Sequence, residues 1–354
     1  MKIALLTIWH EKNFGAEMQA YATVRALKEL GHDVEVIDFR LTESCDFNLK
    51  HRLNLLISSF SDESHGFRQF WRKFIPAGPH YKTIESLQKN PPKADLYLAG
   101  SDQIWNPDIT KGRWKAFFLN FGNEETPRAS YASSIGEDHW KWDRLNDYVS
   151  ARLSKFHAIA VREASAQRIL AEKFGLNSEV VLDPTLLHKD YNEIIIPEST
   201  QHTLVYYPLT ENPELECFSK KLAEEKGLTF VNTNKKKKLF NRIVWRRTSL
   251  PLWIKNIAEA SFVVTPSFHG LAFSLIYNRQ FIVIQNAKKE IRSSRITGLL
   301  DKLGLSDRYF TNVEDALASG IWEQSIDYSQ VNRKLDQLRT QSWKYLKSIS
   351  DSKL

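Results

Sequence analysis

The chain has 354 residues, of which 42% are hydrophobic and 12% aromatic, so it is long for one core, suits two domains and excludes wholesale disorder. Two cysteines exclude a disulfide framework and a cysteine-based metal site, and they favour the cytosol. The net charge of +7 equals the charge of residues 235–247, which hold seven lysines and arginines and no acid. We therefore interpret the basicity as one surface patch and expect no nucleic-acid partner.

The N-terminal segment predicts a β-α-β unit. Lys2–Ile8 is a strand without alternation, as expected of a strand covered on both faces. Its apolar run is too short for a signal peptide, and no run is long enough to span a membrane, so we expect a cytoplasmic protein. A helix at Ala16–Leu30 and a strand at Asp33–Phe39 follow, and this order starts a parallel sheet.

Residues 41–93 have only weak helical patterns, with helices expected at 47–60 and 64–74. We interpret them as a helical insertion at the edge of the first domain. The β-α alternation then resumes, with strands expected at 95–99, 128–133, 157–161 and 180–182 and helices at 145–155 and 164–173. Residues 1–185 are therefore assigned to an N-terminal domain, and residues 183–202 to the junction.

The second half repeats the alternation and predicts a second domain over 203–325. We expect strands at 204–207, 229–232, 262–264 and 281–284 and helices at 213–226, 250–260, 269–277 and 293–303. The basic segment 235–247 is interpreted as a loop or a short helix. Residues 326–354 are mostly one helix, Tyr328–Ser350, which is long enough to pack back on the first domain.

This organisation predicts two doubly wound α/β domains that face a cleft. Ligands of such sheets bind outside the carboxyl ends of the strands, so the residues that follow strands are the candidates. They are His10, Asn13, Gly15, Gly100, Ser101, Asp102, Gln103, Trp105, Asn106, Arg162, Glu163, Asp183, Ser267 and His269. This set is polar, cationic and aromatic, which suits an anionic small molecule together with a sugar.

The turn before His269 is the strongest single candidate for an anion site. An apolar strand at 262–264 meets the turn Thr265–Ser267, and a helix opens at His269. Exposed N–H groups and the positive end of the helix dipole converge at such a position.

Six short motifs occur in series along the chain. They are Asn13-Phe-Gly-Ala16 with Gln19-Ala20, Gly100-Ser-Asp-Gln-Ile-Trp-Asn106, Tyr131-Ala-Ser-Ser-Ile-Gly136, Arg162-Glu-Ala-Ser165, Leu182-Asp-Pro-Thr185 and Ser267-Phe-His-Gly270. Each motif alone is weak, but the series resembles the polysaccharide pyruvyl transferase family from residue 1 to about residue 305.

The resemblance implies two Rossmann-like domains like those of GT-B glycosyltransferases, with the acceptor bound on the N-terminal side and the donor on the C-terminal side. It implies phosphoenolpyruvate as the donor, no cofactor, and an acceptor sugar that gains a cyclic pyruvate ketal. The family's donor arginine corresponds to Arg162 and its histidine to His269. Another branch has Arg-Leu-His where this chain has Ser267-Phe268-His269, so either another residue supplies the missing cation or the phosphate is bound less tightly. Our candidate for that cation is Arg295, with Lys288 behind it.

These residue types suit the chemistry. Arg162 can bind a carboxylate or phosphate bidentately, and His269 can contact the phosphate and protonate it as it leaves. A carboxylate would take the proton of the attacking hydroxyl; we assign this role to Asp102 and keep Asp183 in reserve. No metal is expected, because no paired-carboxylate or HExxH-type motif is present.

The site residues fall into two sets. The donor set is Arg162, Ser267, Phe268, His269, Arg295 and Lys288. The acceptor set is Asn13, Gly15, Gln19, Ser101, Asp102, Gln103 and Trp105. The catalytic residues are His269, Arg162 and Asp102.

Each motif also has a structural interpretation. Asn13–Gly15 could form a tight turn, Asp102 could cap a helix and Trp105 could pack in the core. Arg162–Glu163 could be a surface ion pair. By the same reasoning, His269 could be a hydrogen-bonded structural histidine, and Asp183–Pro184 a structural turn.

The basic segment 235–247 is by default a solvated loop. Apolar residues interleave with its cations, however, and this pattern suits a patch on an anionic membrane surface. The resemblance implies an acceptor built on a lipid carrier at the cytoplasmic face, so we expect a peripheral protein at the inner face of the membrane.

Two other functions remain open at this stage. A nucleotide-sugar glycosyltransferase shares the fold class, although no acidic residue for the ribose follows the strand at 229–232. A non-catalytic glycan-binding protein is the third interpretation, and it predicts that Arg162 and His269 can be replaced without loss of activity.

Overall fold

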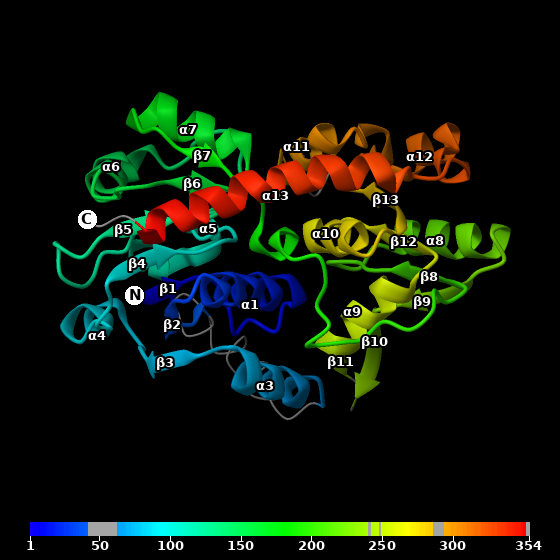
Figure 1. Ribbon diagram of the computed structural model, residues 1–354. Coiled ribbons are helices and arrows are strands. Elements are labelled where there is room, and N and C mark those ends of the chain that lie inside the picture. The colour runs from blue at the N-terminus through cyan, green and yellow to red at the C-terminus, as the bar shows by residue number, and fades with distance from the viewer. Residues whose placement is uncertain (42–61, 240–241, 248, 286–293, 352–354) are drawn as a thin grey trace. The chain divides into compact units, whose positions relative to one another are not determined.

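The computed structural model describes residues 1–41, 62–239, 242–247, 249–285 and 294–351 (Figure 1). Its contacts divide the chain into two compact units. Of the described residues, unit 1 holds 1–41, 68–187 and 337–351, and unit 2 holds 62–67 and those from 188 to 336. Each unit is an α/β fold with its own hydrophobic core.

Unit 1 is built on a five-stranded sheet in the order β3-β2-β1-β4-β5, and all pairs are parallel. The strands are β1 (Lys2–Leu6), β2 (Asp33–Asp38), β3 (Ala77–His80), β4 (Leu96–Ala99) and β5 (Arg128–Ser130). Parallel bridges from Ala129 to Ala158 and from Ser133 to Val161 continue the sheet toward the pair β6 (Ala160–Val161) and β7 (Glu179–Val180). Strands β1 and β4 are buried along almost their whole length, which explains their uninterrupted apolar sequence.

The helices of unit 1 alternate with these strands. They are α1 (Phe14–Glu29), the C-terminal part of α3 (Asp62–Phe74), α4 (Ile84–Lys89), α5 (Pro107–Thr110), α6 (Asn146–Leu153) and α7 (Ala164–Phe174). The helix expected at 64–74 is present as α3, but the helical insertion expected over 41–93 is wrong in one respect, because β3 pairs with β2 and forms the sheet edge. Its sequence, Ala-Gly-Pro-His, has no strand pattern, and Pro is tolerated there because the strand is at an edge. The helix expected at 47–60 lies outside the described residues.

Unit 2 has a second parallel sheet, in the order β14-β13-β12-β8-β9. Its strands are β8 (Thr203–Tyr206), β9 (Thr229–Asn232), β12 (Phe262–Thr265), β13 (Gln280–Ile284) and β14 (Tyr309–Phe310). Its helices are α8 (Pro213–Glu225), α9 (Leu250–Glu259), α10 (Phe268–Ile276), α11 (Ser294–Leu303), α12 (Val313–Ser319) and the first part of α13 (Tyr328–Asp351). Both units are thus doubly wound, as the sequence predicted.

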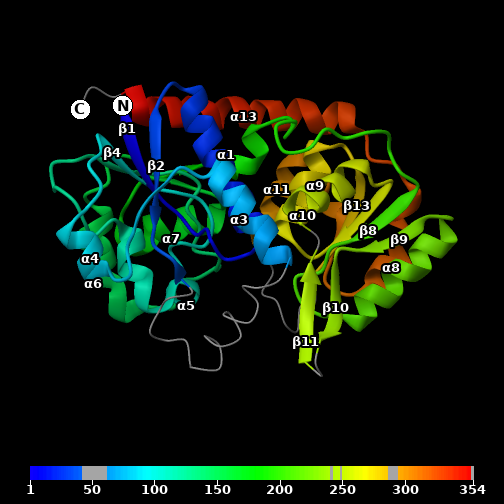
Figure 2. The same cartoon turned by 90° about the horizontal axis from the view of Figure 1, so that it is seen from below.

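The basic segment is neither a loop nor a helix. Strands β10 (Asn234–Leu239) and β11 (Arg242–Arg247) pair antiparallel with Asn234 opposite Arg247, and Figure 2 shows them as a separate ribbon of unit 2. The run of lysines hides the strand pattern, because lysine is depleted in strands and no apolar residue interrupts it.

The C-terminal part of helix α13 packs on unit 1, as expected. The Arg339 Nε donates to the carbonyl of Leu186 (2.7 Å), and the Tyr345 hydroxyl to the carbonyl of Ser130 (2.9 Å). The backbone N–H of Leu182 donates to the Ser342 hydroxyl (2.9 Å). None of the described helices is both long and apolar enough to cross a bilayer.

Candidate functional site

In unit 1 the candidate site residues lie where the strand order of the sheet reverses. The chain runs outward from β1 to β2 and β3 and then returns to place β4 on the other side of β1, so the carboxyl ends of β1 and β4 form the topological switch point. Across it, the Thr7 hydroxyl donates to the carbonyl of Ser101 (2.8 Å). Gly100 fits here because a Cβ would lie 2.8 Å from the Thr7 Cβ. Sequence reasoning missed Thr7, which ends an apolar strand without a polar pattern.

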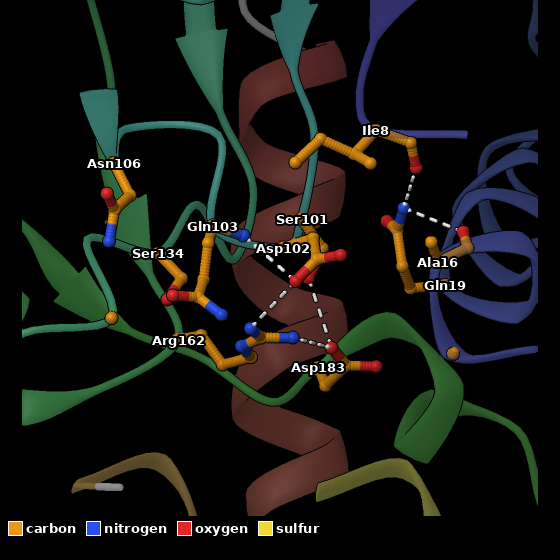
Figure 3. A network of polar contacts seen from close by, with 12 residues as sticks. Ile8, Ala16, Gln19, Ser101, Asp102, Gln103, Asn106, Ser134, Arg162 and Asp183 are labelled. Atoms are coloured by element: carbon orange, nitrogen blue, oxygen red, sulfur yellow. Dashed lines mark hydrogen bonds and ion pairs between the residues drawn. The ribbon is translucent and has the colours of Figure 1, made fainter. Parts of the chain in front are cut away.

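Arg162 is the centre of a buried charge network at this point. Its Nη1 lies 2.7 Å from Asp183 Oδ2 and its Nη2 lies 3.3 Å from Asp102 Oδ1 (Figure 3). The Ser101 hydroxyl also donates to Asp183 Oδ2 (3.1 Å). We call Ser101, Asp102, Arg162 and Asp183 the Arg162 network. Four residues from three distant motifs therefore come together, as their places after strands predicted.

The burial of this network gives its charges different roles. The side chains of Arg162 and Asp183 are 1% and 0% exposed, whereas that of Asp102 is 17% exposed. Burial alone would lower the pKa of Arg162, but the carboxylates of Asp183 and Asp102 outweigh it and raise the pKa, so the guanidinium stays charged. Asp102 is therefore the member that a substrate can reach, while Asp183 compensates the buried cation.

Glu163 is not part of a surface ion pair. It is 2% exposed, and its Oε1 accepts from the Ser134 hydroxyl (2.9 Å) and from the backbone N–H groups of Ile135 (3.0 Å) and Gly136 (3.1 Å). It thereby holds the loop of the third motif beside Arg162, whose own N–H donates to the carbonyl of Ser133 (3.1 Å). The surface-pair interpretation is wrong because Glu163 is buried and accepts from neutral donors. These donors lie 27 to 29 residues away in sequence, so the local pattern could not show them.

Three acceptor candidates have structural partners. The Asn13 side chain caps α1 by accepting from the N–H groups of Gly15 (3.0 Å) and Ala16 (3.4 Å). Gly15 lies inside the helix, so no special backbone conformation accounts for it. The fully buried amide of Gln19 donates to the carbonyls of Ile8 (2.7 Å) and Ala16 (2.9 Å), as Figure 3 shows. Their contact with an acceptor stays a prediction.

Two further acceptor candidates differ in access. Trp105 is 1% exposed, donates to the carbonyl of Phe117 (3.1 Å) and stacks on Phe118, so it is a core residue rather than a platform for sugar. Gln103 is half-buried, and its N–H donates to Asp102 Oδ1 (2.9 Å). Asp102 does not cap a helix, because the cap of α5 is Asn106. The backbone of Asp102 has a φ of 74°, in the left-handed region, and its side chain points toward Arg162 (Figure 3).

In unit 2 the candidate turn lies at the corresponding switch point, between β8 and β12. Helix α10 begins directly after β12, and its cap is Ser267, whose hydroxyl accepts from the N–H of Gly270 (3.3 Å). Thr265 donates to the carbonyl of Tyr207 (2.8 Å) across the switch, and a Cβ on Gly270 would lie 2.5 Å from the Thr265 hydroxyl. The contacts of Thr265 with Tyr207 and Gly270 therefore fix the position of the turn.

The donor candidates of this turn lie close together because they are consecutive in sequence. Ser267, Phe268 and His269 are 3%, 7% and 9% exposed, and the rings of Phe268 and His269 meet edge to face. Gln285, which the sequence did not single out, donates to the carbonyl of Pro266 (3.0 Å) from the end of β13 and fixes the turn from the side. Its place after a strand was the signal that could have found it.

The additional cation is only partly located. Arg295 is the second residue of α11 and is half-buried, and its contact with the donor stays a prediction. Lys288 lies outside the described residues. Within the parts that the structure describes, no group of three histidine, cysteine or acidic side chains could hold a metal ion.

Comparison with protein families identifies the class. The model of the polysaccharide pyruvyl transferase family matches residues 13–288, which is most of the chain and includes all six motifs. The protein belongs to this family, and the resemblance inferred from the motifs is confirmed. A search of curated proteins found no match.

Solved structures support the fold. A UDP-GlcNAc 2-epimerase from Methanocaldococcus jannaschii matches with a TM-score of 0.54 at 10% identity, over 96% of this chain and 100% of that one. S. aureus MnaA with UDP matches with a TM-score of 0.52 at 9% identity, over 98% and 90%. The Neisseria meningitidis UDP-GlcNAc 2-epimerase has a TM-score of 0.51 at 8% identity, over 98% and 93%. The fold is therefore GT-B-like, and likeness at such low identity shows the fold alone.

Proposed function

We propose that the protein transfers the pyruvyl group of phosphoenolpyruvate to two hydroxyls of a glycan sugar and forms a cyclic ketal. The observation that carries this proposal is the family match over residues 13–288, which includes His269 at the start of α10. A capped helix N-terminus with a histidine suits a phosphate, because the helix dipole and the backbone N–H groups attract anions.

The reaction balances without a metal or redox partner. A proton adds to the methylene carbon of phosphoenolpyruvate, and a sugar hydroxyl attacks the cationic C2 and releases its own proton. The C2–O bond to phosphate breaks, and a second hydroxyl closes the ketal and releases its proton. The products are the ketal and inorganic phosphate; one of the two released protons accounts for the methyl group, and the other is taken up by the leaving phosphate.

The residues divide this work in our proposal. His269 contacts the phosphate and protonates it as it leaves. Asp102 takes the proton of the attacking hydroxyl, because its side chain is partly exposed while that of Asp183 is fully buried. Both described contacts of the Asp102 carboxylate, from Arg162 and from the N–H of Gln103, are at Oδ1, and Oδ2 is the oxygen we assign as the base.

Arg162 has a narrower role in this proposal than the sequence suggested. Its guanidinium is buried and already bonded to two carboxylates, so it neutralises and orients Asp102 as the structure stands. Direct binding of phosphoenolpyruvate by Arg162 stays a prediction.

Sugar-dependent phosphate release from phosphoenolpyruvate tests the proposal. We expect the wild-type protein to release phosphate only with an acceptor sugar present, and His269→Gln to slow the reaction by about 10²–10⁴-fold. His188→Gln is the matched control, because His188 is also a buried histidine of unit 2 outside the proposed machinery. Equal rates for the two variants would contradict the role of His269. Thermal stabilisation by UDP without any phosphate release would favour a nucleotide-sugar glycosyltransferase.

We also propose that the β10–β11 ribbon contacts an anionic membrane surface, where a lipid-linked acceptor would reside. In its register Lys235 pairs with Arg246 and Lys236 with Trp245, so cations occupy both strands. Flotation with anionic liposomes should show weaker binding after Lys235–Lys238 are changed to Gln. Equal flotation of variant and wild type would remove this proposal.

A further inference from the structure

Unit 1 has a cavity that the Arg162 network does not use. It has a volume of about 590 Å³, which is within the range of small-molecule sites, about 300–1,000 Å³. Its walls come from the loop after β1, the end of β2 and the helix α3. It therefore lies at the carboxyl ends of β1 and β2, where ligands of doubly wound sheets bind. We call it the β1–β2 pocket.

The β1–β2 pocket is positively charged. Four cationic side chains line it, Lys12, Arg40, Arg68 and Arg72, against the two carboxylates of Glu11 and Asp38, which leaves a net charge of +2. Arg40 and Asp38 compensate each other, because Arg40 Nε and Nη2 contact the two carboxylate oxygens at 2.8 and 2.7 Å. In the loop after β1 the charges of Lys12 and Glu11 cancel, so the excess charge comes from Arg68 and Arg72 of α3.

The loop after β1 is held in an unfavourable conformation. His10 and Lys12 have φ values of 66° and 52°, in the left-handed region that is unfavourable for non-glycine residues. The buried Glu17 fixes the loop by accepting from the N–H of Glu11 (3.0 Å) and from the Trp71 Nε1 (2.6 Å). Strain retained by such contacts is typical of preorganised binding sites.

One wall of the pocket is aromatic and uncharged. The imidazole of His10 stacks on the indole of Trp71 with ring centres 3.7 Å apart, and Trp9 meets both edge to face. Burial, together with the nearby Arg40, lowers the pKa of His10 to about 4, so the ring is neutral at pH 7. Cations beside an apolar wall suit a ligand with an anionic group on a less polar ring.

We propose that the β1–β2 pocket binds a phosphate or diphosphate ester of a saccharide, with Lys12 and Arg72 contacting the phosphate. The cationic excess selects the phosphate, and the Trp71 and His10 wall borders the sugar. The saccharide part of this assignment rests on the proposed function, in which the ligand is the phosphorylated end of the acceptor. The anion part rests on the pocket alone.

Calorimetric titration of the full chain tests this assignment. We expect the wild type to bind inorganic diphosphate and glucose 1-phosphate but not glucose. The double variant Lys12→Gln/Arg72→Gln should bind both phosphates at least tenfold more weakly, since it removes both cationic hydrogen-bond donors assigned to the phosphate.

A charge-matched double variant controls for the lost cations. Arg25→Gln/Lys73→Gln removes the same charge from α1 and α3, but Arg25 pairs with Glu29 on the surface and Lys73 lies over the Phe74 ring. It should bind like the wild type. Equal weakening in both double variants would overturn the proposal, as would a wild type that binds neither phosphate.

Binding of phosphoenolpyruvate tests the assignment of this pocket independently of the proposed function. Its binding should be the same in the wild type and in Lys12→Gln/Arg72→Gln. Loss of phosphoenolpyruvate binding in that variant would overturn the saccharide assignment, because the pocket would then be a donor site. Failure of sugar-dependent phosphate release with diphosphate binding intact would contradict the proposed function only.

Discussion

Helices α1 and α10 occupy similar places in their units but begin differently. Each follows a strand at a switch point, and each has a polar cap, Asn13 or Ser267. The first turn of α1 contains an acid of its own, Glu17, whereas that of α10 contains none and presents His269. The positive end of α1 therefore already faces a side chain that can carry negative charge, while that of α10 suits an external anion.

The two switch points differ in the same way. In both, a threonine hydroxyl reaches the carbonyl at the end of the neighbouring strand at 2.8 Å, and a glycine packs against that threonine. At its switch point unit 1 has a buried ion pair of its own, Arg162 with Asp183. At its switch point unit 2 has the capped N-terminus of α10. The same fold position thus stabilises charge internally in one unit and suits a ligand in the other.

We expect the largest loss of stability when the buried ion pair of unit 1 is broken. Arg162→Met should lower the free energy of unfolding by about 3–5 kcal/mol, because Asp183 would be left as a buried carboxylate without its cation. Urea unfolding followed by tryptophan fluorescence measures it. Arg25→Met, which removes an exposed pair with Glu29, should cost at most about 0.5 kcal/mol. Equal losses for the two variants would show that the network is not a buried charge cluster.

The acid of α1 predicts an unusual pH dependence. Burial raises the pKa of Glu17 from its ordinary value of 4.5 to about 8. Between these two pH values the folded chain holds a proton on Glu17 that the unfolded chain releases. The free energy of unfolding should therefore fall as pH rises through this window, by about 1.4 kcal/mol per pH unit at most, and level off above it.

Glu17→Gln isolates this contribution, because glutamine keeps the shape and cannot ionise. Urea midpoints at about pH 5, 6.5 and 8 should decline less steeply in the variant than in the wild type. Parallel declines would mean that Glu17 is already ionised in the folded protein.

A smaller effect is expected at the α10 switch. Gly270→Ala should destabilise the protein by about 1–3 kcal/mol, because the new Cβ would lie 2.5 Å from the Thr265 hydroxyl and 2.8 Å from its Cγ2. Gly298→Ala in α11 is the matched control, since no atom lies within 4 Å of its Cβ position. That change should stabilise by roughly 0.5–1 kcal/mol. Thermal unfolding of both variants gives the comparison, and shifts of the same sign would contradict it.

The helix caps should give the smallest effects. Asn13→Ala and Ser267→Ala should each cost about 1 kcal/mol, because each removes an acceptor for N–H groups of the first turn. Only Ser267→Ala should also raise the KM for phosphoenolpyruvate, since only α10 is assigned the phosphate of the donor. Parallel unfolding and phosphate-release assays at varied phosphoenolpyruvate check this, and an equal rise of that KM in Asn13→Ala would contradict the difference between the two helix starts.

The parts of the fold that sequence reasoning predicted have strong local patterns. Strand β12 and helix α10 lie within one residue of their expected bounds, because an apolar run, a proline turn and a glycine follow one another there. Strand β3 and the β10–β11 ribbon were missed because their pairing, not their own sequence, makes them strands. Strand β3 is Ala-Gly-Pro-His and β10 contains four consecutive lysines, and glycine, proline and lysine carry little strand propensity.

The same distinction holds for the site. The rule that ligands lie after strands gathered Ser101, Asp102, Arg162 and Asp183, and the structure brings these together. It could not indicate that Arg162 would be neutralised internally, since Asp102 and Asp183 lie 60 and 21 residues away from it in sequence. Nor did it reveal the β1–β2 pocket, whose cations belong to a loop and to α3.

Transfer of labelled carbon from phosphoenolpyruvate to a glycan tests the central claim most directly. The account predicts that label from the pyruvyl carbons appears on a lipid-linked or synthetic acceptor in an acid-labile form, with one phosphate released for each pyruvyl group. His269→Gln should abolish most of this transfer, and His188→Gln should not. Release of phosphate without label on any acceptor, or transfer of a sugar from a UDP-sugar in its place, would contradict the account.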